Sequence, residues 1–282
     1  MKIMLSRKGF DSQYGRIPSP ILPDGTLLSL PIPTSESGCR YADLSNQDLR
    51  YSDLIVTLGG DRALADGCCH LDPDLRLGQA PGWVPAFGQT GAAQTHLENQ
   101  GVGVGDLFLF FGRFRQTQYA PDGRLRYVKA APTQHVVFGY LQIGTIVRGD
   151  RIRDYPWHPH AENPRPLPNN TLYLASDRLT FTEAAGSGVL DHRDDRVLTA
   201  PGLAQSRWRL LDWMNSASVS YHNQASIKDG YFQSAAKGQE FVVDGSSLTR
   251  SWAESVICAN RDPTRALNQH DRRRREELPW RT

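Results

Sequence analysis

Two apolar runs joined by a polar excursion constrain the fold of this chain more than any other stretch. Residues 107–111 read Leu-Phe-Leu-Phe-Phe without a polar break, which is typical of a strand buried on both faces. Residues 136–147 form the second run and are its expected partner. Glycines interrupt these runs at Gly112, Gly139 and Gly144. Glycine inside a strand marks a bulge or a close backbone approach, so we expect a curved sheet at the centre of the fold.

The rest of the chain favours an α+β fold around this centre. We expect further strands at residues 2–6, 27–32 and 54–58, and helices at residues 91–100 and 247–257. The 282 residues include 18 prolines and 25 glycines, which indicates long loops. The fold class predicted is therefore α+β, with a curved mixed β-sheet or partial barrel as its core and a few peripheral helices.

No internal repeat or clear linker divides the sequence. We therefore expect one domain over residues 1–257, followed by a charged C-terminal tail at 258–282. The four cysteines show no CxxC pair or zinc-finger spacing, which fits reduced thiols. No stretch approaches the length of a membrane span, and a net charge of +2 does not by itself indicate a membrane or nucleic-acid partner. We expect a cytoplasmic protein without membrane association.

The first candidate site is a basic glycine loop after the N-terminal strand. Backbone donors beside a glycine, with two adjacent cations, are suited to holding a phosphate. The alternative is a solvated loop in which the acidic or hydroxyl side chain only caps a turn. We assign ligand binding to six residues of this loop: Ser6, Arg7, Lys8, Gly9, Phe10 and Ser12. Asp11 is assigned to catalysis.

The second candidate site is His70-Leu-Asp72-Pro-Asp74. In an extended segment the three polar side chains share one face, because strand side chains alternate with period two. Such a face could chelate a metal or serve acid–base chemistry; alternatively, both carboxylates cap turns. We assign His70, Asp72 and Asp74 as catalytic.

A rigid loop contains Trp157, His158 and His160. The His-x-His spacing occurs in some metal sites, but spacing fixes no third ligand nearby, so we assign no metal ligands and favour packing beside Trp157. Trp157 and His158 are assigned to ligand binding, with the indole holding a base.

Basic and aromatic residues alternate around a predicted hairpin at 116–132. This pattern is expected of a surface that contacts phosphates and stacks bases, and it also fits an ordinary solvated hairpin. We assign nucleic-acid binding to Arg113, Arg115, Arg124, Arg126 and Lys129.

Several of these stretches resemble the nucleotide-modification-associated domain 3 family. The resemblance is carried by Ser-Arg-Lys-Gly-Phe-Asp-Ser at 6–12, the proline-rich segment 18–33, His-Leu-Asp-Pro-Asp-Leu at 70–75, Gly-Asp-Leu-Phe-Leu-Phe-Phe-Gly at 105–112, Phe-Gly-Tyr-Leu-Gln-Ile-Gly at 138–144 and Gly-Gln-Glu-Phe-Val at 238–242. It implies an α+β domain associated with DNA base hypermodification in phages and bacteria. It carries over no catalytic residue. The central strands are also similar to the curved sheets of pseudouridine-synthase-associated and ASCH-type domains, which bind nucleic acid or modified bases.

Together these features predict a protein that acts in the modification of nucleic-acid bases, most readily in DNA. We favour an enzyme, a base- or nucleotide-modifying transferase or hydrolase. A non-catalytic reader of modified bases is the first alternative, and a module that binds a partner modification enzyme is the second. The expected ligand is a nucleotide or DNA containing modified bases. The sequence identifies no cofactor.

Overall fold

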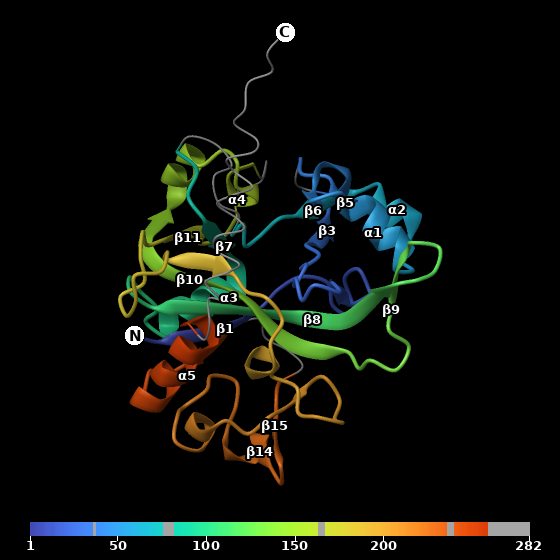
Figure 1. The fold of residues 1–282 in the computed structure, drawn as a ribbon. Helices are drawn as coiled ribbons and strands as arrows, with labels where there is room; N and C mark the ends of the chain where they lie inside the picture. Colours follow the sequence, from blue (N-terminus) through green and yellow to red (C-terminus); the bar gives the residue numbers. More distant parts are fainter. Residues whose placement is uncertain (36–37, 76–81, 163–166, 236–239, 259–282) are drawn as a thin grey trace.

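A mixed sheet of nine strands forms the centre of the computed structural model, which describes residues 1–35, 38–75, 82–162, 167–235 and 240–258 (Figure 1). Its main path runs β16 (Glu240–Val243), β1 (Ile3–Arg7), β8 (Leu107–Tyr119), β10 (Gln134–Arg148), β11 (Thr171–Ala175) and β7 (Ala86–Gln89). Strands β2 (Ser19–Ile21) and β9 (Leu125–Tyr127) pair with β8, and β12 (Ser187–Val189) pairs with β10. Most pairs are antiparallel, but β1 and β2 run parallel to β8. This confirms the predicted α+β class and mixed sheet.

The two longest strands are the predicted pair. Strand β8 pairs antiparallel with β10, and both are buried over most of their length. On β8, Leu109 packs into the cluster on one face of the sheet, and Phe108 and Phe110 pack into the cluster on the other. Burial on both faces explains why this strand reads as a continuous apolar run rather than an alternating one.

Bulges curve the sheet at two of the predicted glycines. The register between β8 and β10 shifts between Val137 and Gly139, and the register between β10 and β11 shifts between Ile143 and Thr145. At Gly144, an added Cβ atom would lie 2.6 Å from the Cα atom of Ser176. The glycine is therefore required by the close approach of another backbone segment.

Curvature brings the two edges of the sheet together without forming a closed barrel within the described residues. Strands β16 and β7 are the ends of the main path, yet the Lys8 ammonium, next to β16, lies 4.2 Å from the ring centroid of Phe87 on β7. The sheet is thus curved but not closed within the described residues, in agreement with the predicted curved sheet or partial barrel.

Each face of the sheet has its own cover. The helix α5 (Ser247–Cys258) and a small sheet of β13 (Arg207–Trp208), β15 (Tyr231–Gln233) and β14 (Ile227–Lys228) lie below it in Figure 1. The opposite cluster includes Leu97 of helix α3 (Gly91–Asn99) and Phe87 of β7. Helix α4 (Pro159–Glu162) packs outside β7.

A third layer lies beside β9. It contains helices α1 (Tyr51–Thr57) and α2 (Arg62–Ala65) and two small two-stranded sheets, β3 (Ile32–Thr34) with β6 (Cys68–His70) and β4 (Ser45–Asn46) with β5 (Leu49–Arg50). Short 3₁₀ helices occur at Tyr41–Asp43, Gly149–Asp154, Asp194–Arg196, Asp212–Asn215 and Gln224–Ser226.

Two strand predictions fall in this layer and are wrong. Residues 54–57 belong to helix α1 rather than to a strand, and Leu58 caps the end of that helix. Of the predicted strand at 27–32, Leu27 forms only an isolated bridge with Ile21, residues 28–31 are in no strand, and Ile32 begins β3; the backbone N–H of Leu30 donates to the hydroxyl of Ser19. The predicted helices at 91–100 and 247–257 are confirmed. The predicted tail begins at Cys258, the last residue of α5; its remainder, 259–282, lies outside the described residues.

Candidate functional site

Two sequence motifs that are distant in the chain meet outside strand β7. His70 is the last residue of β6, and Asp72 comes two residues later. His158 immediately precedes helix α4, and His160 lies in the first turn of that helix. The Asp72 side chain is 4% exposed, His158 is 0% exposed and His160 is 5% exposed; only His70, at 28%, is open to solvent. We call these four residues the Asp72 cluster.

The two carboxylate oxygens of Asp72 face different neighbours. Oδ1 accepts a hydrogen bond of 2.9 Å from the backbone N–H of Gly88 and lies 3.4 Å from His158 Nε2. Oδ2 lies 3.5 Å from His70 Nε2 and 3.7 Å from His160 Nε2. One oxygen is thus held by the backbone, and the other faces two imidazoles.

Gly88 makes this approach possible. A Cβ atom at this position would lie 2.6 Å from the His160 ring and 2.8 Å from Cε1 of His158. Because any side chain would displace the imidazoles, glycine at the middle of β7 lets the histidine loop pack directly on the strand.

Hydrogen bonds to the other ring nitrogens define the tautomers of the two buried histidines. His160 Nδ1 lies 2.6 Å from Oδ1 of Asn170, whose amide group donates to the His160 carbonyl. Nδ1 of His160 is therefore the donor, and its Nε2 carries the lone pair. His158 Nδ1 accepts from the backbone N–H of His160, so its Nε2 carries the proton and faces Oδ1 of Asp72.

The cluster holds a carboxylate in its ionised form. Burial opposes ionisation of Asp72, but the neighbouring His158 and His70 outweigh it and keep the pKa of the carboxyl well below its usual range. Burial lowers the pKa of His160 to about 4, which keeps this imidazole neutral at pH 7. A buried anion among imidazoles can accept a proton, orient a histidine base or contribute to a cation site. The ligand atoms of His70, Asp72 and His160 all lie within 4.8 Å of one another.

Comparison with protein families gives one match. The model of the nucleotide modification associated domain 3 family covers residues 2–244. The chain belongs to this family. No curated protein and no solved structure matches it. Family membership places the protein in nucleotide modification, and within the matched region lie all members of the Asp72 cluster.

The two remaining residues assigned to catalysis are Asp74 and Asp11. Asp74 is 6% exposed, and its backbone pairs with that of Ala86, the first residue of β7. The Asp11 carboxylate accepts hydrogen bonds from the backbone N–H groups of Gln13 and Tyr14, as a turn-capping residue does.

Most side chains of the N-terminal loop contact other parts of the same chain. The Lys8 ammonium lies 2.9 Å from Glu240, Arg7 donates to the carbonyl of Ala235, and Phe10 is 1% exposed against Tyr41. Gly9 adopts a φ of 78° above the hydroxyl of Ser29. Ser6 is buried and Ser12 lies exposed in a turn. Trp157 is half-buried beside Tyr155, immediately before His158.

The five basic residues assigned to nucleic acid separate into two groups. Arg113 donates to Gln205, and Arg115 donates to the carbonyls of Val128 and Lys129 and lies over the Tyr127 ring. Lys129 itself is exposed.

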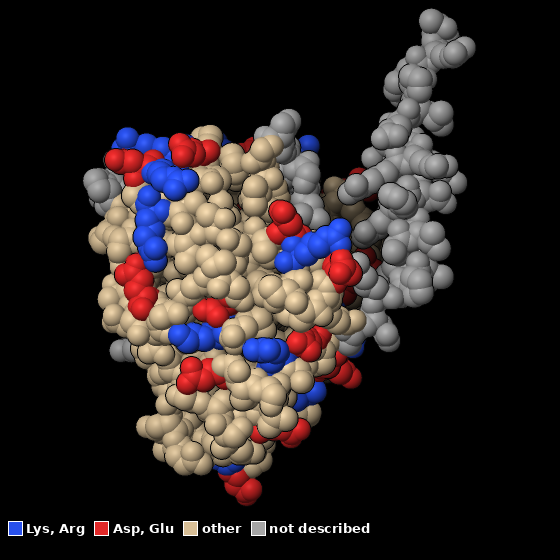
Figure 2. All heavy atoms as spheres, turned by 90° about the vertical axis from the view of Figure 1, so that its left-hand side faces the viewer, with Lys and Arg blue, Asp and Glu red and all other residues tan. Residues whose placement is uncertain are grey.

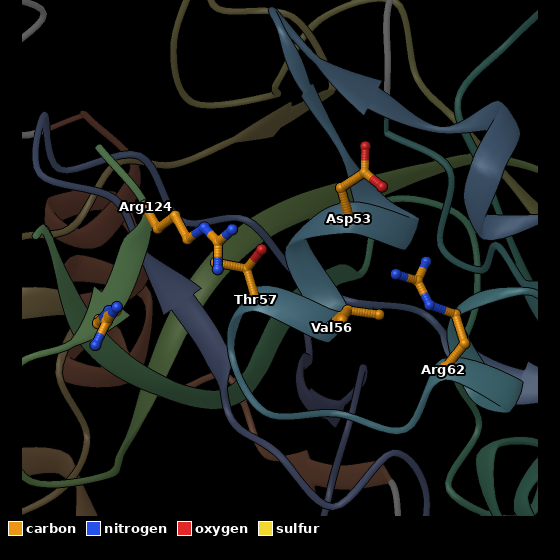
Figure 3. Close-up of a pocket in the computed structure, with 6 residues that line it drawn as sticks. Asp53, Val56, Thr57, Arg62 and Arg124 are labelled. Atoms are coloured by element: carbon orange, nitrogen blue, oxygen red, sulfur yellow. The ribbon is translucent and has the colours of Figure 1, made fainter. Parts of the chain in front are cut away.

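Arg124 and Arg126 instead line a polar pocket of about 570 Å³ together with Asp53, Val56, Thr57 and Arg62. In Figure 3 the side chain of Arg124, which directly precedes β9, extends toward Thr57 of helix α1. Arg62 of α2 lies on the other side of α1 in this view. Arg126 also pairs with Asp122. We call this the arginine pocket; in Figure 1 its elements, α1, α2 and β9, lie apart from α4 and β7.

Charges elsewhere are mixed. Figure 2 shows basic and acidic side chains interspersed on the face turned toward the viewer, rather than one large basic surface. Among the described residues, helices long and apolar enough to cross a membrane are absent.

The sequence indicated the two motifs of the Asp72 cluster as separate sites and did not predict that they contact each other. His160, Gly88 and Asn170 carried no assignment, although His-x-His spacing pointed to the first of them. Gly88 and Asn170 acquire their roles only through packing, and no local pattern distinguishes them from other glycines and asparagines.

Proposed function

We propose that this protein is an enzyme that modifies a base, in a nucleotide or in DNA, and that its reaction takes place at the Asp72 cluster. Family membership supports the nucleotide part of this proposal. The observation that carries the enzymatic part is a carboxylate that is 4% exposed and lies 3.4–3.7 Å from three histidine rings, which lower its pKa. Strongly perturbed ionisable groups gather at catalytic sites more often than elsewhere.

The surroundings of the cluster suit a substrate with an aromatic ring. His70 is its solvent-accessible member, so a substrate would approach from that side. Trp157 is half-buried and adjacent in sequence to His158, and an indole of this kind stacks on a base. If the base is in a duplex, the enzyme must first extract it from the stack.

The test is product analysis with a matched pair of variants. Purified protein is incubated with nucleotides, sugar nucleotides and short DNAs carrying plain or 5-hydroxymethylated pyrimidines, with and without divalent cations, and the nucleosides are analysed by mass spectrometry. Asp72→Asn should abolish product formation. It should retain the thermal stabilisation by substrate, about 2.7 kcal/mol at a ligand concentration one hundred times Kd.

Asp150→Asn is the control, because Asp150 is exposed on a 3₁₀ turn. It should leave both the product and the thermal shift unchanged. Undiminished product formation by a folded Asp72→Asn variant would rule out the Asp72 cluster as the reacting site.

A non-catalytic reader is the second candidate, and the arginine pocket favours it. Guanidinium groups bind phosphate in bidentate geometry, and Arg62 and Arg124 line a pocket large enough for a nucleotide phosphate. Under this function, DNA binding should require these arginines and no product should form.

Arg62→Ala and Arg124→Ala should then each weaken DNA binding. Each variant should also lower the slope of log affinity against log salt concentration by about one, because one phosphate contact is lost. Arg178→Ala serves as the control, since Arg178 is exposed and pairs with Glu183 outside the pocket. Equal DNA affinity in all three variants would exclude the pocket from nucleic-acid binding.

A further inference from the structure

We propose that His70, Asp72 and His160 bind a divalent transition-metal ion, and that His158, Gly88 and Asn170 hold these ligands in position. The proposal rests on the geometry of the ligands and not on the proposed function. It joins two motifs that sequence spacing left separate.

The first argument is the separation of the ligand atoms. Asp72 Oδ2 lies 3.5 Å from His70 Nε2 and 3.7 Å from His160 Nε2. Both distances exceed the usual N–H···O hydrogen bond of about 2.9 Å. Metal–ligand bonds of about 2.0–2.1 Å at tetrahedral angles place two ligand atoms about 3.4 Å apart. These two separations match those of ligand atoms around one ion, and the ligand atoms of all three residues lie within 4.8 Å of one another.

The second argument is the direction of the lone pairs. Asn170 Oδ1 accepts a hydrogen bond from Nδ1–H of His160, so Nε2 of His160 carries a lone pair, and this nitrogen lies 3.7 Å from Oδ2 of Asp72. A ring nitrogen with a lone pair and a carboxylate oxygen this close together in a buried site form a pair of donor atoms that a cation can bind.

The third argument is the support around the ligands. Gly88 N–H and His158 Nε2 both face Oδ1 of Asp72, which leaves Oδ2 for the ion. Asn170 fixes the ring of His160 through its other nitrogen. Metal-binding histidines and carboxylates are oriented in this way by outer partners, which contribute to affinity.

The donor set indicates the class of ion. Two imidazoles and one carboxylate suit Fe²⁺ or Zn²⁺, whereas Mg²⁺ and Ca²⁺ prefer all-oxygen sites. Three protein ligands leave coordination positions open, as catalytic sites do. His70 is 28% exposed, so the open side of the ion would face solvent and substrate.

The experiment measures metal binding directly. The full chain is treated with a chelator, dialysed and titrated anaerobically with Fe²⁺, Zn²⁺ or Co²⁺, and binding is followed by calorimetry and by the visible absorption of Co²⁺. We expect one equivalent per chain. His70→Gln and His160→Gln should each lower the affinity at least 100-fold, and Asn170→Leu should lower it by about 10–100-fold.

His192→Gln is the matched control, because His192 lies in a loop outside the cluster. It should bind like the parent protein. Circular dichroism and melting of each metal-free variant show that the fold is retained. Failure of the parent protein to bind one equivalent of any of the three ions would overturn the proposal, as would unchanged affinity in both folded His→Gln variants.

The outcome is separable from that of the activity assay. One bound equivalent without any product supports the metal site and contradicts the proposed enzyme. Product formation by protein shown to be free of metal supports the enzyme and overturns a catalytic role for the ion.

Discussion

Gln89 Nε2 donates a hydrogen bond of 2.7 Å to Oε1 of Glu240, and this bond joins the two edge strands of the large sheet. The same oxygen lies 2.9 Å from the ammonium of Lys8. Glu240 is 1% exposed and lies on β16, at one end of the strand order; Gln89 lies on β7 at the other end, and Lys8 directly follows β1, the neighbour of β16. The Gln89–Glu240 hydrogen bond therefore connects the two edges of the curved sheet, and the Lys8 ammonium compensates the buried charge of Glu240.

Removal of Lys8 should destabilise the protein strongly. Lys8→Met leaves a buried carboxylate without its cation, which costs about 3–5 kcal/mol in the free energy of unfolding. The double variant Lys8→Met/Glu240→Gln should recover a large part of this loss, because both charges are gone. Urea unfolding of the four proteins gives the coupling energy.

Lys228→Met is the control, since Lys228 is exposed. Its free energy of unfolding should stay within about 0.5 kcal/mol of the parent value. Additive losses in the double variant would contradict a coupled pair.

The central sheet was predictable because its signals are local. An unbroken apolar run at 107–111 requires burial on both faces, and glycine at 139 and 144 marks the points where the register shifts. Helix α1 was not predictable in this way. Leu54, Ile55 and Val56 are typical of a strand, but burial of Leu54, Ile55 and Leu58 follows helical spacing, so packing on the third layer determines the outcome.

The Asp72 cluster was half predictable for the same reason. His70 and Asp72 were recognised because a single residue separates them, and His158 and His160 for the same reason. Their meeting depends on Gly88 of β7, whose missing side chain allows the contact. Sequence spacing carries no information on contacts between distant segments, so the third ligand could not be assigned.

A methyl group at Gly144 should test the second bulge. Gly144→Ala places a Cβ atom 2.6 Å from the Cα atom and 2.8 Å from the backbone nitrogen of Ser176, and backbone atoms cannot rotate away as a side chain can. We expect a loss of about 1–3 kcal/mol in thermal or urea unfolding. Gly103→Ala is the control, because a Cβ atom there meets open space at an ordinary φ. Equal stability of both variants would show that the bulge tolerates a side chain.

Acid should destabilise the fold through His135. Burial lowers the pKa of His135 to about 3, and its Nδ1 accepts the indole N–H of Trp208. In the unfolded chain His135 takes up a proton near pH 6.5, whereas in the folded protein it stays neutral until about pH 3. Its contribution to the free energy of unfolding is therefore complete above pH 6.5 and is lost progressively as pH falls toward 3. Between pH 7 and pH 5 the loss is on the order of 2 kcal/mol.

His135→Asn isolates this contribution. Asparagine offers an oxygen to Trp208 but does not titrate, so the variant should lose less stability than the parent protein between pH 7 and pH 5. Urea unfolding at the two pH values measures the difference. An identical pH dependence in both proteins would mean that His135 is not the responsible group.

Cysteine reactivity should differ sharply between Cys69 and Cys258. The Cys69 thiol lies 3.8 Å from the Cys39 sulfur, and this hydrogen bond, together with burial, raises its pKa above the usual range. Cys258 is exposed at the end of α5. Because the thiolate is the reactive form, iodoacetamide at pH 8 should alkylate Cys258 at least about tenfold faster than Cys69. Peptide mass spectrometry over a time course measures both rates, and denaturant should make them similar. A Cys258→Ser variant whose Cys69 is alkylated rapidly in the folded state would contradict the buried thiol pair.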